Sequence, residues 1–430
     1  LDCYSHQELE SLGSGGWGYH HFPITVRFAR QLGQDYLGMT GKFHKSWADF
    51  GGFKTKEALE LECFNMLATG AKCCVGDQLH PSGRITPATY DLIGAVYESV
   101  QAKEPWCEGA KAVTEIGVFT PELLETVPHG SITIDDSLHG AYRMLIESHQ
   151  QFDVLDEHCD LSPYKVLILP DKITLTPEFA RKLEDYVAAG GSLILSHRSG
   201  TRAGADEFAL GGVGARILGE AEYSPDFVVA SPAIAAGIPA SEHVMYERGL
   251  AVALAGGEAL AEVWDPYFNR TYQHFCSHFH TPVDKASGRP GIVKSGRIIY
   301  LAHPIFGLYQ RHGARVYKQL VLNCLDLLLP GKLLTTNAPT TAHLTVNRQP
   351  DRGRTVVHIL HYIPERRANG LDTIEDAIPL HNVALSLRLP AAPRRAYLAP
   401  QGEELPYTYE GGAARVTVPE VVGHQMVVFE

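Results

Sequence analysis

The amino-terminal part of the chain alternates short apolar segments with amphipathic segments and polar loops. Short apolar segments predict β-strands, and segments with apolar residues every three to four positions predict helices. The predicted elements are strands at 1–5, 35–41 and 71–77 and helices at 23–34, 55–70 and 88–106. A strand followed by a loop and a helix, repeated in this way, is typical of parallel strands joined by crossover helices.

The loops that follow these strands carry most of the Trp, His, Asp and Glu residues of this region. In a (β/α)8 barrel, the active site lies at the carboxyl-terminal end of the strands. Three strands cannot close a barrel, and an open parallel sheet of that size would leave both edges bare. We therefore expect residues 1–108 to be the carboxyl-terminal portion of a catalytic (β/α)8 TIM barrel whose earlier strands lie outside this sequence.

Residues 109–331 continue the alternation of strands and helices. The predicted elements are strands at 112–120, 152–158, 164–171 and 192–200 and helices at 137–150 and 176–191. Thr176 and Pro177 suit the amino-terminal cap and the first position of the last helix. This pattern favours an α/β, doubly wound, flavodoxin-like sheet.

The same segment resembles the class I glutamine amidotransferase architecture, in which a cysteine nucleophile lies on the turn after a strand. In "SHRSG", His197 occupies the corresponding position. Ser199 lies close by, but a serine nucleophile needs a base that a third group holds in place. Because the turn has no thiol, the sequence argues against amidotransferase chemistry.

The remaining residues, 332–430, change to short segments in which apolar and polar residues alternate. Such segments, with turn residues between them, predict a small antiparallel β-sandwich. The predicted strands lie at 341–349, 354–363, 382–390, 413–420 and 424–430.

Composition narrows the class of protein. At 430 residues the chain exceeds the size of a single hydrophobic core, so several domains are expected. The formal net charge is -12 and no dense basic stripe offsets it, which argues against nucleic acid as a partner. No apolar run approaches the ~20 residues that cross a bilayer, so no membrane contact is expected. The eight cysteines are scattered without a CxxC pair, and we expect reduced thiols in a cytoplasmic protein.

Five longer motifs carry a family resemblance: "ELESLGSGGWGYHHFP", "GMTGKFHKSWADFGG", "GDQLHPSGR", "HFHTPVD" and "HYIPERR". They resemble the hypothetical glycosyl hydrolase 6 group, which includes the α-L-fucosidases of glycoside hydrolase family 151. The layout is similar to that of family 42 β-galactosidases, whose middle domain mediates trimerisation. The resemblance implies a barrel end, a trimerisation domain and a β-sandwich, with the boundaries 1–108, 109–331 and 332–430.

The resemblance also implies a retaining glycosidase with two carboxylates about 5–5.5 Å apart, one a nucleophile and the other a general acid/base. In the similar fucosidases the nucleophile is an aspartate on an earlier barrel strand, and no residue of this sequence matches it. Glu8 and Glu10 follow the first predicted strand. One of them, with Glu10 favoured, is expected to be the acid/base, kept protonated near neutral pH by aromatic surroundings. Either could instead be a solvated acid or a partner of Arg27 or Arg30.

The other candidate residues of the sugar pocket are aromatic or hydrogen-bonding groups in the three loops: Trp17, Tyr19, His20, Lys42, His44, Trp47, Asp77 and His80. Aromatic rings stack on the apolar face of a sugar, and the polar groups hydrogen-bond its hydroxyls. Structural interpretations stay open beside this one. Trp17 and Tyr19 could plug the barrel as core residues. The cationic loop could pair with Asp49, and Asp77 could bond the backbone before Pro81.

His278 and His280 belong to the polar, aromatic motif "SHFHTPVD" of the middle domain. Two histidines separated by one residue share a face of a strand, so zinc is one interpretation. A third ligand of suitable spacing is missing, and no metal is expected. Because the resemblance implies oligomerisation through this domain, either histidine could complete the pocket of a neighbouring subunit. The more ordinary interpretation is a satisfied interface histidine.

These observations predict an exo-acting α-L-fucosidase that works by double displacement, without a metal or another cofactor. The expected partners are a fucosylated or galactosylated oligosaccharide and further copies of the chain, in a dimer or trimer. The close alternative is a β-galactosidase or another exo-glycosidase. A third interpretation is a non-catalytic fragment for oligomerisation or carbohydrate binding, in which the partial barrel contributes only packing.

Overall fold

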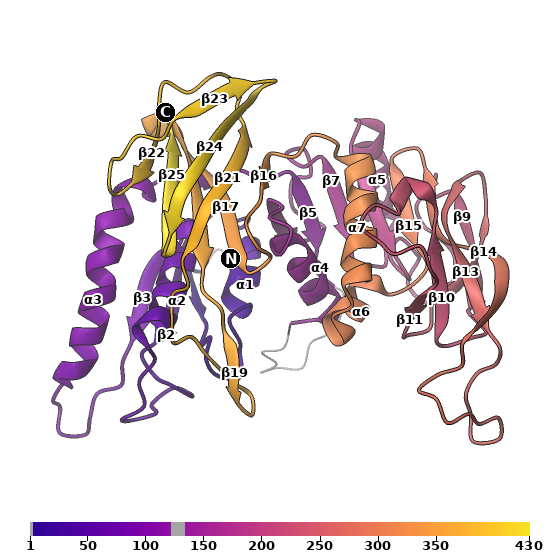
Figure 1. Cartoon of the computed structure of the whole chain (residues 1–430), viewed down its shortest axis with the longest axis horizontal. Coiled ribbons are helices and arrows are strands. Elements are labelled where there is room, and N and C mark those ends of the chain that lie inside the picture. The colour runs from indigo at the N-terminus through magenta and orange to yellow at the C-terminus, as the bar shows by residue number, and fades with distance from the viewer. Residues whose placement is uncertain (1–2, 122–133) are drawn as a thin grey trace. The chain divides into compact units, whose positions relative to one another are not determined.

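The computed structural model describes residues 3–121 and 134–430, which form two compact units. The first unit contains the residues up to 114 together with 145–153 and 332–430, and the second contains 115–144 and 154–331. Figure 1 shows the helices and strands of both units. The mixed α/β class expected from the sequence is confirmed, and the two ends of the chain share one unit.

The amino-terminal segment forms a three-stranded parallel sheet in the order β1-β2-β3. Its strands are β1 (His6–Glu10), β2 (Asp35–Gly41) and β3 (Lys72–Gly76). The strand predicted at 1–5 is wrong at residues 3–5, because the first strand begins at His6, where pairing with Asp35 starts. Residues 1 and 2 lie outside the described part of the chain. Pairing with β2, rather than local apolar composition, decides where the first strand lies.

Helices follow each of these strands, as the alternation predicted. They are α1 (His21–Ala29), α2 (Lys56–Ala68) and α3 (Pro87–Lys103), the last continued by the short 3-10 helix η1 (Glu104–Trp106). α2 begins at a threonine cap, because the Thr55 side chain accepts a hydrogen bond from the amide of Ala58 at 3.2 Å.

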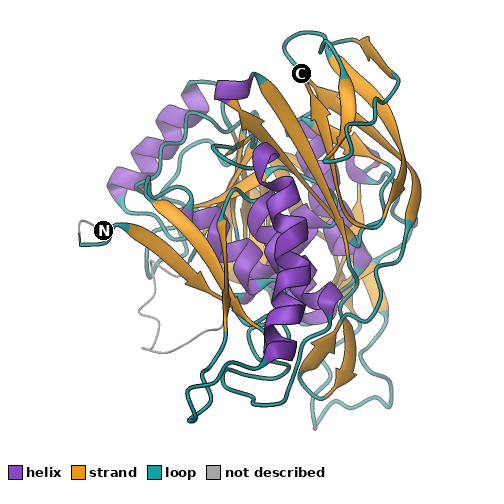
Figure 2. Cartoon of the chain, turned by 90° about the vertical axis from the view of Figure 1, so that its left-hand side faces the viewer, coloured by secondary structure: helices purple, strands orange, loops and turns teal. Residues whose placement is uncertain are grey.

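α2 is buried on both sides. Towards the parallel sheet, a Cβ at Gly38 would lie 2.7 Å from Cγ of Met66, so α2 and β2 approach closely. On the other side, Phe64 of α2 shares a hydrophobic core with Leu360 and Tyr362 of the carboxyl-terminal segment. Figure 2 shows the helices and strands of this unit by colour. α2 is therefore a middle layer between the parallel sheet and the sandwich.

Residues 332–430 build two antiparallel sheets around one core, as the alternating pattern predicted. The five-stranded sheet has the order β22 (Ala396–Ala399), β25 (Gly423–Phe429), β18 (Arg354–His361), β17 (Ala342–Gln349) and β4 (Lys111–Ala112). The four-stranded sheet has the order β16 (Leu334–Thr336), β21 (Leu380–Arg388), β24 (Ala413–Val421) and β23 (Tyr407–Glu410). A small hairpin, β19 (Glu365–Ala368) and β20 (Leu371–Thr373), and the 3-10 helix η3 (Pro350–Arg352) complete this segment.

A nine-stranded sheet, in the order β11-β10-β13-β14-β15-β8-β7-β5-β6, forms the framework of the second unit. One half contains β5 (Ile116–Phe119), β6 (Phe152–Leu155), β7 (Val166–Leu169), β8 (Ser192–Ser196) and β15 (Ile298–Leu301). These strands are fully buried, and in chain order they are arranged 2-1-3-4-5, as in flavodoxin-like sheets. The helices of the unit are α4 (Asp136–Ile146), α5 (Pro177–Ala188), α6 (Ile305–His312) and α7 (Arg315–Leu328).

The other half of this sheet is antiparallel and was not predicted. It contains β10 (Asp226–Ala230), β11 (His243–Met245), β13 (Glu258–Pro266) and β14 (Val283–Ser295), beside a separate pair, β9 (Ala215–Glu220) and β12 (Leu250–Leu254), and the 3-10 helix η2 (Pro232–Ile234). The expectation of a strand carrying His278 and His280 is wrong. Because Pro266 pairs with Val283, the residues between them form the loop of a hairpin.

Two further features concern the whole chain. Among the described residues, no helix combines the length and the apolar character needed to cross a bilayer. All eight cysteines are free thiols.

Candidate functional site

β1 carries two acidic side chains on the face of the parallel sheet that the helices leave open. Leu9 points the other way and packs with Phe22 of α1 and Met66 of α2. Because side chains alternate along a strand, Glu8 and Glu10 share the opposite face, and both are exposed. The sequence placed the two acids in a loop after the first strand. In the structure they lie within β1, and Glu10 is its last residue.

This open face continues across β2 and β3. Glu10 is paired with Met39, and Met39 with Cys74, so the three side chains form a row across the sheet. Burial and then the charge of Glu8 raise the pKa of the Cys74 thiol, so the carboxylate acts on the same face. One row further towards the carboxyl ends, Gly41 is paired with Gly76, which leaves space above the sheet.

Trp47 occupies that space over β3. A Cβ at Gly76 would lie 2.6 Å from the Trp47 ring, so a larger residue at this position would displace the indole. The ring meets Phe43 edge-on at 5.2 Å, and its Nε1 donates a hydrogen bond to Oε1 of Gln78 at 3.2 Å. With 38% of its surface exposed, Trp47 stays open to a ligand on the face that carries Glu10.

Lys42 follows β2, and its side chain contacts residues of its own loop. Its side chain is buried, and its ammonium lies over the rings of Phe43 and Phe53 at 4.7 and 4.4 Å. His44 is half-buried, and Asp49 accepts a hydrogen bond from a backbone amide of the same loop at 3.2 Å. The cation is therefore held by aromatic rings inside the loop rather than presented to the open face.

The loop that follows β3 contacts the tip of the loop that follows β2. Asp77 is half-buried and His80 is exposed. Nδ1 of His80 accepts a hydrogen bond from the amide of Ser82 at 3.2 Å, and its ring meets Phe50 edge-on at 6.3 Å. Both candidate residues thus lie beyond the carboxyl end of the sheet, where the sequence placed them.

The glycine-rich motif folds into consecutive turns before α1. Gly15 passes so close to the loop that follows β2 that a Cβ would lie 2.4 Å from the carbonyl oxygen of Lys45. Trp17 meets His21 edge-on at 4.7 Å, and Nδ1 of His21 is 3.1 Å from the hydroxyl of Ser11. Burial lowers the pKa of His21 to about 4, so this imidazole is neutral at physiological pH. Trp17 is half-buried against it.

Tyr19 turns from this motif into the interior. It packs on Gly13, where a Cβ would lie 2.7 Å from its ring, and burial followed by the charge of Glu62 raises its pKa. Among the described residues its buried hydroxyl has no hydrogen-bond partner. The cavity beside it measures about 10 Å³, which suits one water molecule and excludes a sugar. His20, next in the chain, is half-buried at the start of α1.

A buried ion pair that the sequence analysis missed holds these loops together. Nζ of Lys54 lies 2.7 Å from both carboxylate oxygens of Glu62 in α2. Glu62 also accepts hydrogen bonds from the Thr40 hydroxyl at 2.9 Å and from the amide of Gly13 at 3.2 Å. One carboxylate therefore links the loop after β1, the end of β2 and α2. The signal in the sequence that could have indicated this ion pair was an acidic residue within the otherwise apolar surface of a buried helix.

His278 and His280 lie in the second unit, in the loop 267–282. His278 is exposed, whereas His280 is half-buried, meets Phe227 edge-on at 5.7 Å and has Nδ1 3.0 Å from the carbonyl oxygen of Thr281. Nowhere in the described chain do three His, Cys, Asp or Glu side chains gather as metal ligands would.

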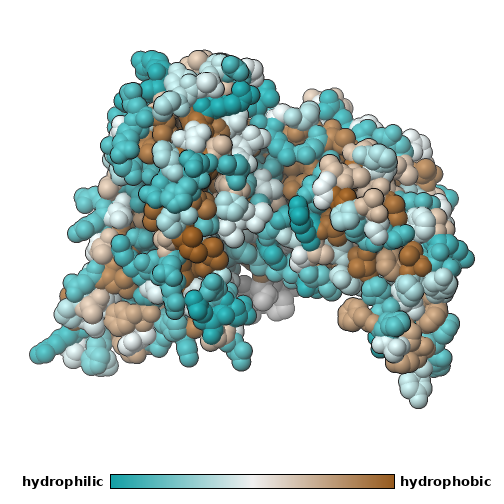
Figure 3. Space-filling model, viewed as in Figure 1, coloured by the Kyte–Doolittle hydropathy of each residue, from teal (hydrophilic) through white to brown (hydrophobic). Residues whose placement is uncertain are grey.

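The same loop exposes four aromatic side chains. We call them the aromatic tip, and their exposed fractions are 60% for Tyr267, 96% for Tyr272, 64% for Phe275 and 83% for Phe279. In Figure 3 apolar side chains gather on this protruding loop, at the lower right. Exposed aromatic groups in such a number mark an interaction surface.

The turn after β8 has the sharp geometry of a nucleophile elbow without its chemistry. His197 adopts a positive φ of 48°, and its amide donates to the carbonyl oxygen of Leu301 at 2.8 Å. Burial lowers the pKa of His197 to about 4. Ser199 is buried, and its hydroxyl accepts a hydrogen bond from the amide of Ile173 at 3.0 Å. The serine is thus engaged in holding the turn.

Comparison with known proteins connects these features to glycoside hydrolases. The family described as the β-galactosidase trimerisation domain matches residues 124–326. A comparison with curated proteins gave no match. Among solved structures, α-L-fucosidase isoenzyme 2 from Paenibacillus thiaminolyticus is 40% identical, covers 100% of this chain and superposes with a TM-score of 0.95.

Two β-galactosidases share the fold at low identity. The enzyme from Bacillus circulans sp. alkalophilus is 17% identical over 95% of this chain, with a TM-score of 0.63. The cold-adapted enzyme from Rahnella sp. R3 is 14% identical over 98%, with a TM-score of 0.65. The chain spans 65% of the fucosidase and 58% and 60% of these two enzymes, which is less than two thirds of each. Residues 124–326 thus match the β-galactosidase trimerisation domain in sequence, and the chain as a whole is similar to α-L-fucosidase isoenzyme 2, which confirms the resemblance carried by its motifs.

Proposed function

We propose that this chain supplies the carboxyl-terminal part of a (β/α)8 barrel to a retaining exo-glycoside hydrolase that releases terminal L-fucose. The observation that carries the proposal is the open face of the parallel sheet, where Glu10 ends β1 and Trp47 covers β3. Barrel enzymes place their catalytic groups at this end of the strands. The 40% identity to an α-L-fucosidase over the whole chain supports fucose as the sugar.

Residues 1–108, 109–331 and 332–430 are proposed as barrel end, doubly wound trimerisation domain and β-sandwich. Within the described ranges the outer edges of β1 and β3 pair with no strand, which supports further barrel strands beside them. An aspartate on one of those strands would be the nucleophile. The eight free thiols support a reducing, cytoplasmic compartment.

In the proposed mechanism Glu10 handles the proton. The external aspartate attacks the anomeric carbon, the glycosidic C–O bond breaks, and the carboxylic acid of Glu10 gives its proton to the departing oxygen. In the second step the Glu10 carboxylate takes a proton from water, the water oxygen bonds to the anomeric carbon, and the aspartate leaves. Carboxylates carry both steps, so the proposal includes no metal or cofactor. Trp47 would stack on the sugar, and Asp77 and His80 would bind its hydroxyls.

The experiment compares Glu10→Gln with Glu8→Gln, its neighbour on the same face, in the polypeptide that contains the complete barrel. We expect Glu10→Gln to lower kcat for an alkyl fucoside by about 10²–10⁴-fold, because its leaving group needs the proton. An activated nitrophenyl fucoside should suffer less in its first step. Glu8→Gln should retain most activity. Full activity in both variants would refute the assignment, and loss in Glu8→Gln alone would move the acid/base role to Glu8.

A β-galactosidase is the second candidate, because the trimerisation-domain family and the lower-identity structural relatives carry that name. Rates on nitrophenyl fucoside, galactoside and arabinoside distinguish the sugars. Binding of a sugar without hydrolysis of any of these substrates would favour the non-catalytic interpretation.

We further propose that the second unit assembles copies of the chain into a dimer or trimer. Its trimerisation-domain match and the exposed aromatic tip support this. In the assembly, His278 or His280 would enter the sugar pocket of a neighbouring subunit and complete it. The aromatic side chains beside these histidines would pack against the neighbouring subunit and hold the loop in its pocket.

A further inference from the structure

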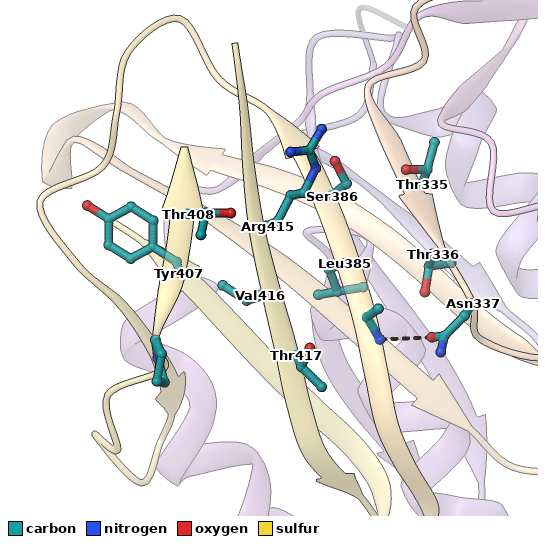
Figure 4. Close-up of a pocket in the computed structure, with 12 residues that line it drawn as sticks. Thr335, Thr336, Asn337, Leu385, Ser386, Tyr407, Thr408, Arg415, Val416 and Thr417 are labelled. Atoms are coloured by element: carbon teal, nitrogen blue, oxygen red, sulfur yellow. Dashed lines mark hydrogen bonds between the residues drawn. The ribbon is translucent and has the colours of Figure 1, made fainter. Parts of the chain in front are cut away.

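The outer face of the four-stranded sheet presents a polar row that the proposed mechanism does not use. Side chains alternate along these strands, so Leu385 and Val416 point into the sandwich core and their neighbours point outwards. Strand pairing places four outward residues side by side on adjacent strands: Thr335, Ser386, Arg415 and Thr408. Figure 4 shows these four side chains on one surface of the sheet.

The row lines a groove of about 780 Å³. Ala384 and Thr417, which pair with each other, form the next row, and their short side chains leave space above the sheet. On one side Asn337 is fixed, since its Oδ1 accepts the amide of Ala384 at 2.8 Å (Figure 4). On the core side of the sheet, Tyr407 packs against the sandwich core, and its hydroxyl donates to the carbonyl oxygen of Pro393, which fixes β23 beside the groove. One wall of the groove and the strand beside it are thus held by hydrogen bonds to backbone groups.

The charge of the groove is unusual for this chain. Arg415 is the one charged residue among those that line it, whereas the whole chain has a net charge of -12. Glu410 lies 3.4 Å from Arg415 in a highly exposed pair, which is a weak competitor for the guanidinium. Three hydroxyls that can both donate and accept share the row with this cation.

We propose that this groove binds a short oligosaccharide that carries one anionic substituent, either a sulfate ester or a carboxylate. The anionic group pairs with Arg415, and Ser386, Thr335 and Thr408 exchange hydrogen bonds with the sugar hydroxyls. Four strands about 4.8 Å apart give a row long enough for more than one sugar ring. The choice of a glycan rests on the proposed glycosidase function, while the preference for an anion follows from the groove itself.

Isothermal titration of the full chain with three disaccharides tests the proposal: a sulfated fucose disaccharide, a uronate-containing one and a neutral fucose disaccharide. We expect at least one anionic sugar to bind at least tenfold more tightly than the neutral one, and the stronger of the two identifies the substituent. Arg415→Gln should weaken that binding about tenfold, or about 1.4 kcal/mol. Glu410→Gln should strengthen it, because the competing carboxylate is gone.

Arg388→Gln is the matched control, since Arg388 is exposed on the same strand and lies outside the groove. It should leave the affinity unchanged. Equal affinity for neutral and anionic sugars, no saturable binding of any probe, or equal losses in Arg388→Gln and Arg415→Gln would overturn the proposal. Self-association that depends on Arg415 in sedimentation experiments would also overturn it, because a second copy would then occupy the groove. Hydrolysis of nitrophenyl fucoside by the complete enzyme should be the same in all three variants, so failure here is distinguishable from failure of the proposed activity.

Discussion

Glu62 joins three segments of the first unit through one carboxylate. Its side chain is 8% exposed and that of Lys54 is 1% exposed, so the pair is almost removed from water. Removing one partner of such a pair leaves a buried charge without compensation, which is more harmful than the loss of the contact itself. The loop that carries Gly13 and the end of β2 that carries Thr40 depend on this acid for their positions.

Lys54→Met should therefore lower the free energy of unfolding by about 3–5 kcal/mol. Lys56→Met is the matched control, because Lys56 is a half-exposed lysine at the start of α2 that pairs with Glu60 at 3.2 Å. That change should lower it by about 0.5 kcal/mol or less. Urea unfolding followed by circular dichroism measures both, and similar midpoints for the two variants would contradict the role given to the buried pair.

Residue types alone predict which chemistry a side chain can perform better than they predict the direction in which that side chain points. The acids of β1 and Trp47 were selected from the sequence, and the structure brings them to one face of the sheet. Tyr19 and Lys42 were selected by the same argument, yet they turn into the interior and into a loop. The sequence does not distinguish an aromatic ring or an ammonium group that faces a ligand from one that packs against a neighbouring ring. The direction of Tyr19 is set by partners distant in the chain such as Glu62, and that of Lys42 by the rings of its own loop.

At the scale of elements, local signals predict helices and central strands well. α2, β2 and the sandwich strands lie where periodicity and turn residues placed them, and α5 begins at its predicted threonine cap, Thr176. The edge strand β1 was displaced, because its register is set by β2. The antiparallel strands β10 to β14 were missed, because their pairing joins segments far apart in the chain through irregular registers that break the alternating pattern.

Asp171 fastens the start of α6 to the end of β7. Its carboxylate accepts hydrogen bonds from the amide of Gly307 and the hydroxyl of Ser196, both at 2.7 Å. Burial raises its pKa to about 6, although these hydrogen bonds and the charge of Arg311 act in the opposite direction. The folded protein therefore holds this proton more tightly than the unfolded chain does.

A raised pKa contributes stability below the unfolded value of about 4, and this contribution is lost as the pH rises through about 6. Across this window the free energy of unfolding of the unmodified chain should fall by at most about 3 kcal/mol, and the midpoint temperature of thermal unfolding should fall with it. In Asp171→Asn this fall should be absent. Asp160→Asn is the control, because hydrogen bonds from Ser162 lower the pKa of that exposed acid. Calorimetric curves that run parallel for the unmodified chain and Asp171→Asn would contradict the prediction.

At the scale of the whole molecule, the residues proposed for chemistry and those proposed for assembly lie in different units. The acids of β1 lie in the first unit, whereas His278, His280 and the aromatic tip lie in the second. The resemblance to α-L-fucosidases could be inferred from long motifs, because these extend over several loops at once. The function of the tip could not, since a pair of histidines in a loop has several chemistries and only the exposure of the surrounding rings favours assembly.

Subunit mixing tests whether the tip acts on a neighbour. One population of the complete enzyme carries Glu10→Gln, and the other carries His278→Ala with His280→Ala. Each alone should be nearly inactive, and mixed assemblies should regain activity, because a subunit with an intact barrel then meets an intact tip. His158→Ala, an exposed histidine elsewhere in the second unit, should retain full activity alone. Absence of recovery in correctly assembled mixtures would refute the sharing.

The middle position of α2 also bears on how such chains diversify. Phe64 faces the sandwich and Met66 faces the parallel sheet, so residues two positions apart in one helix pack against two different surfaces. A recombination event that exchanged only the sandwich would leave this helix with a bare apolar flank. Successful shuffling in this lineage therefore has to transfer the helix and both of its covers together.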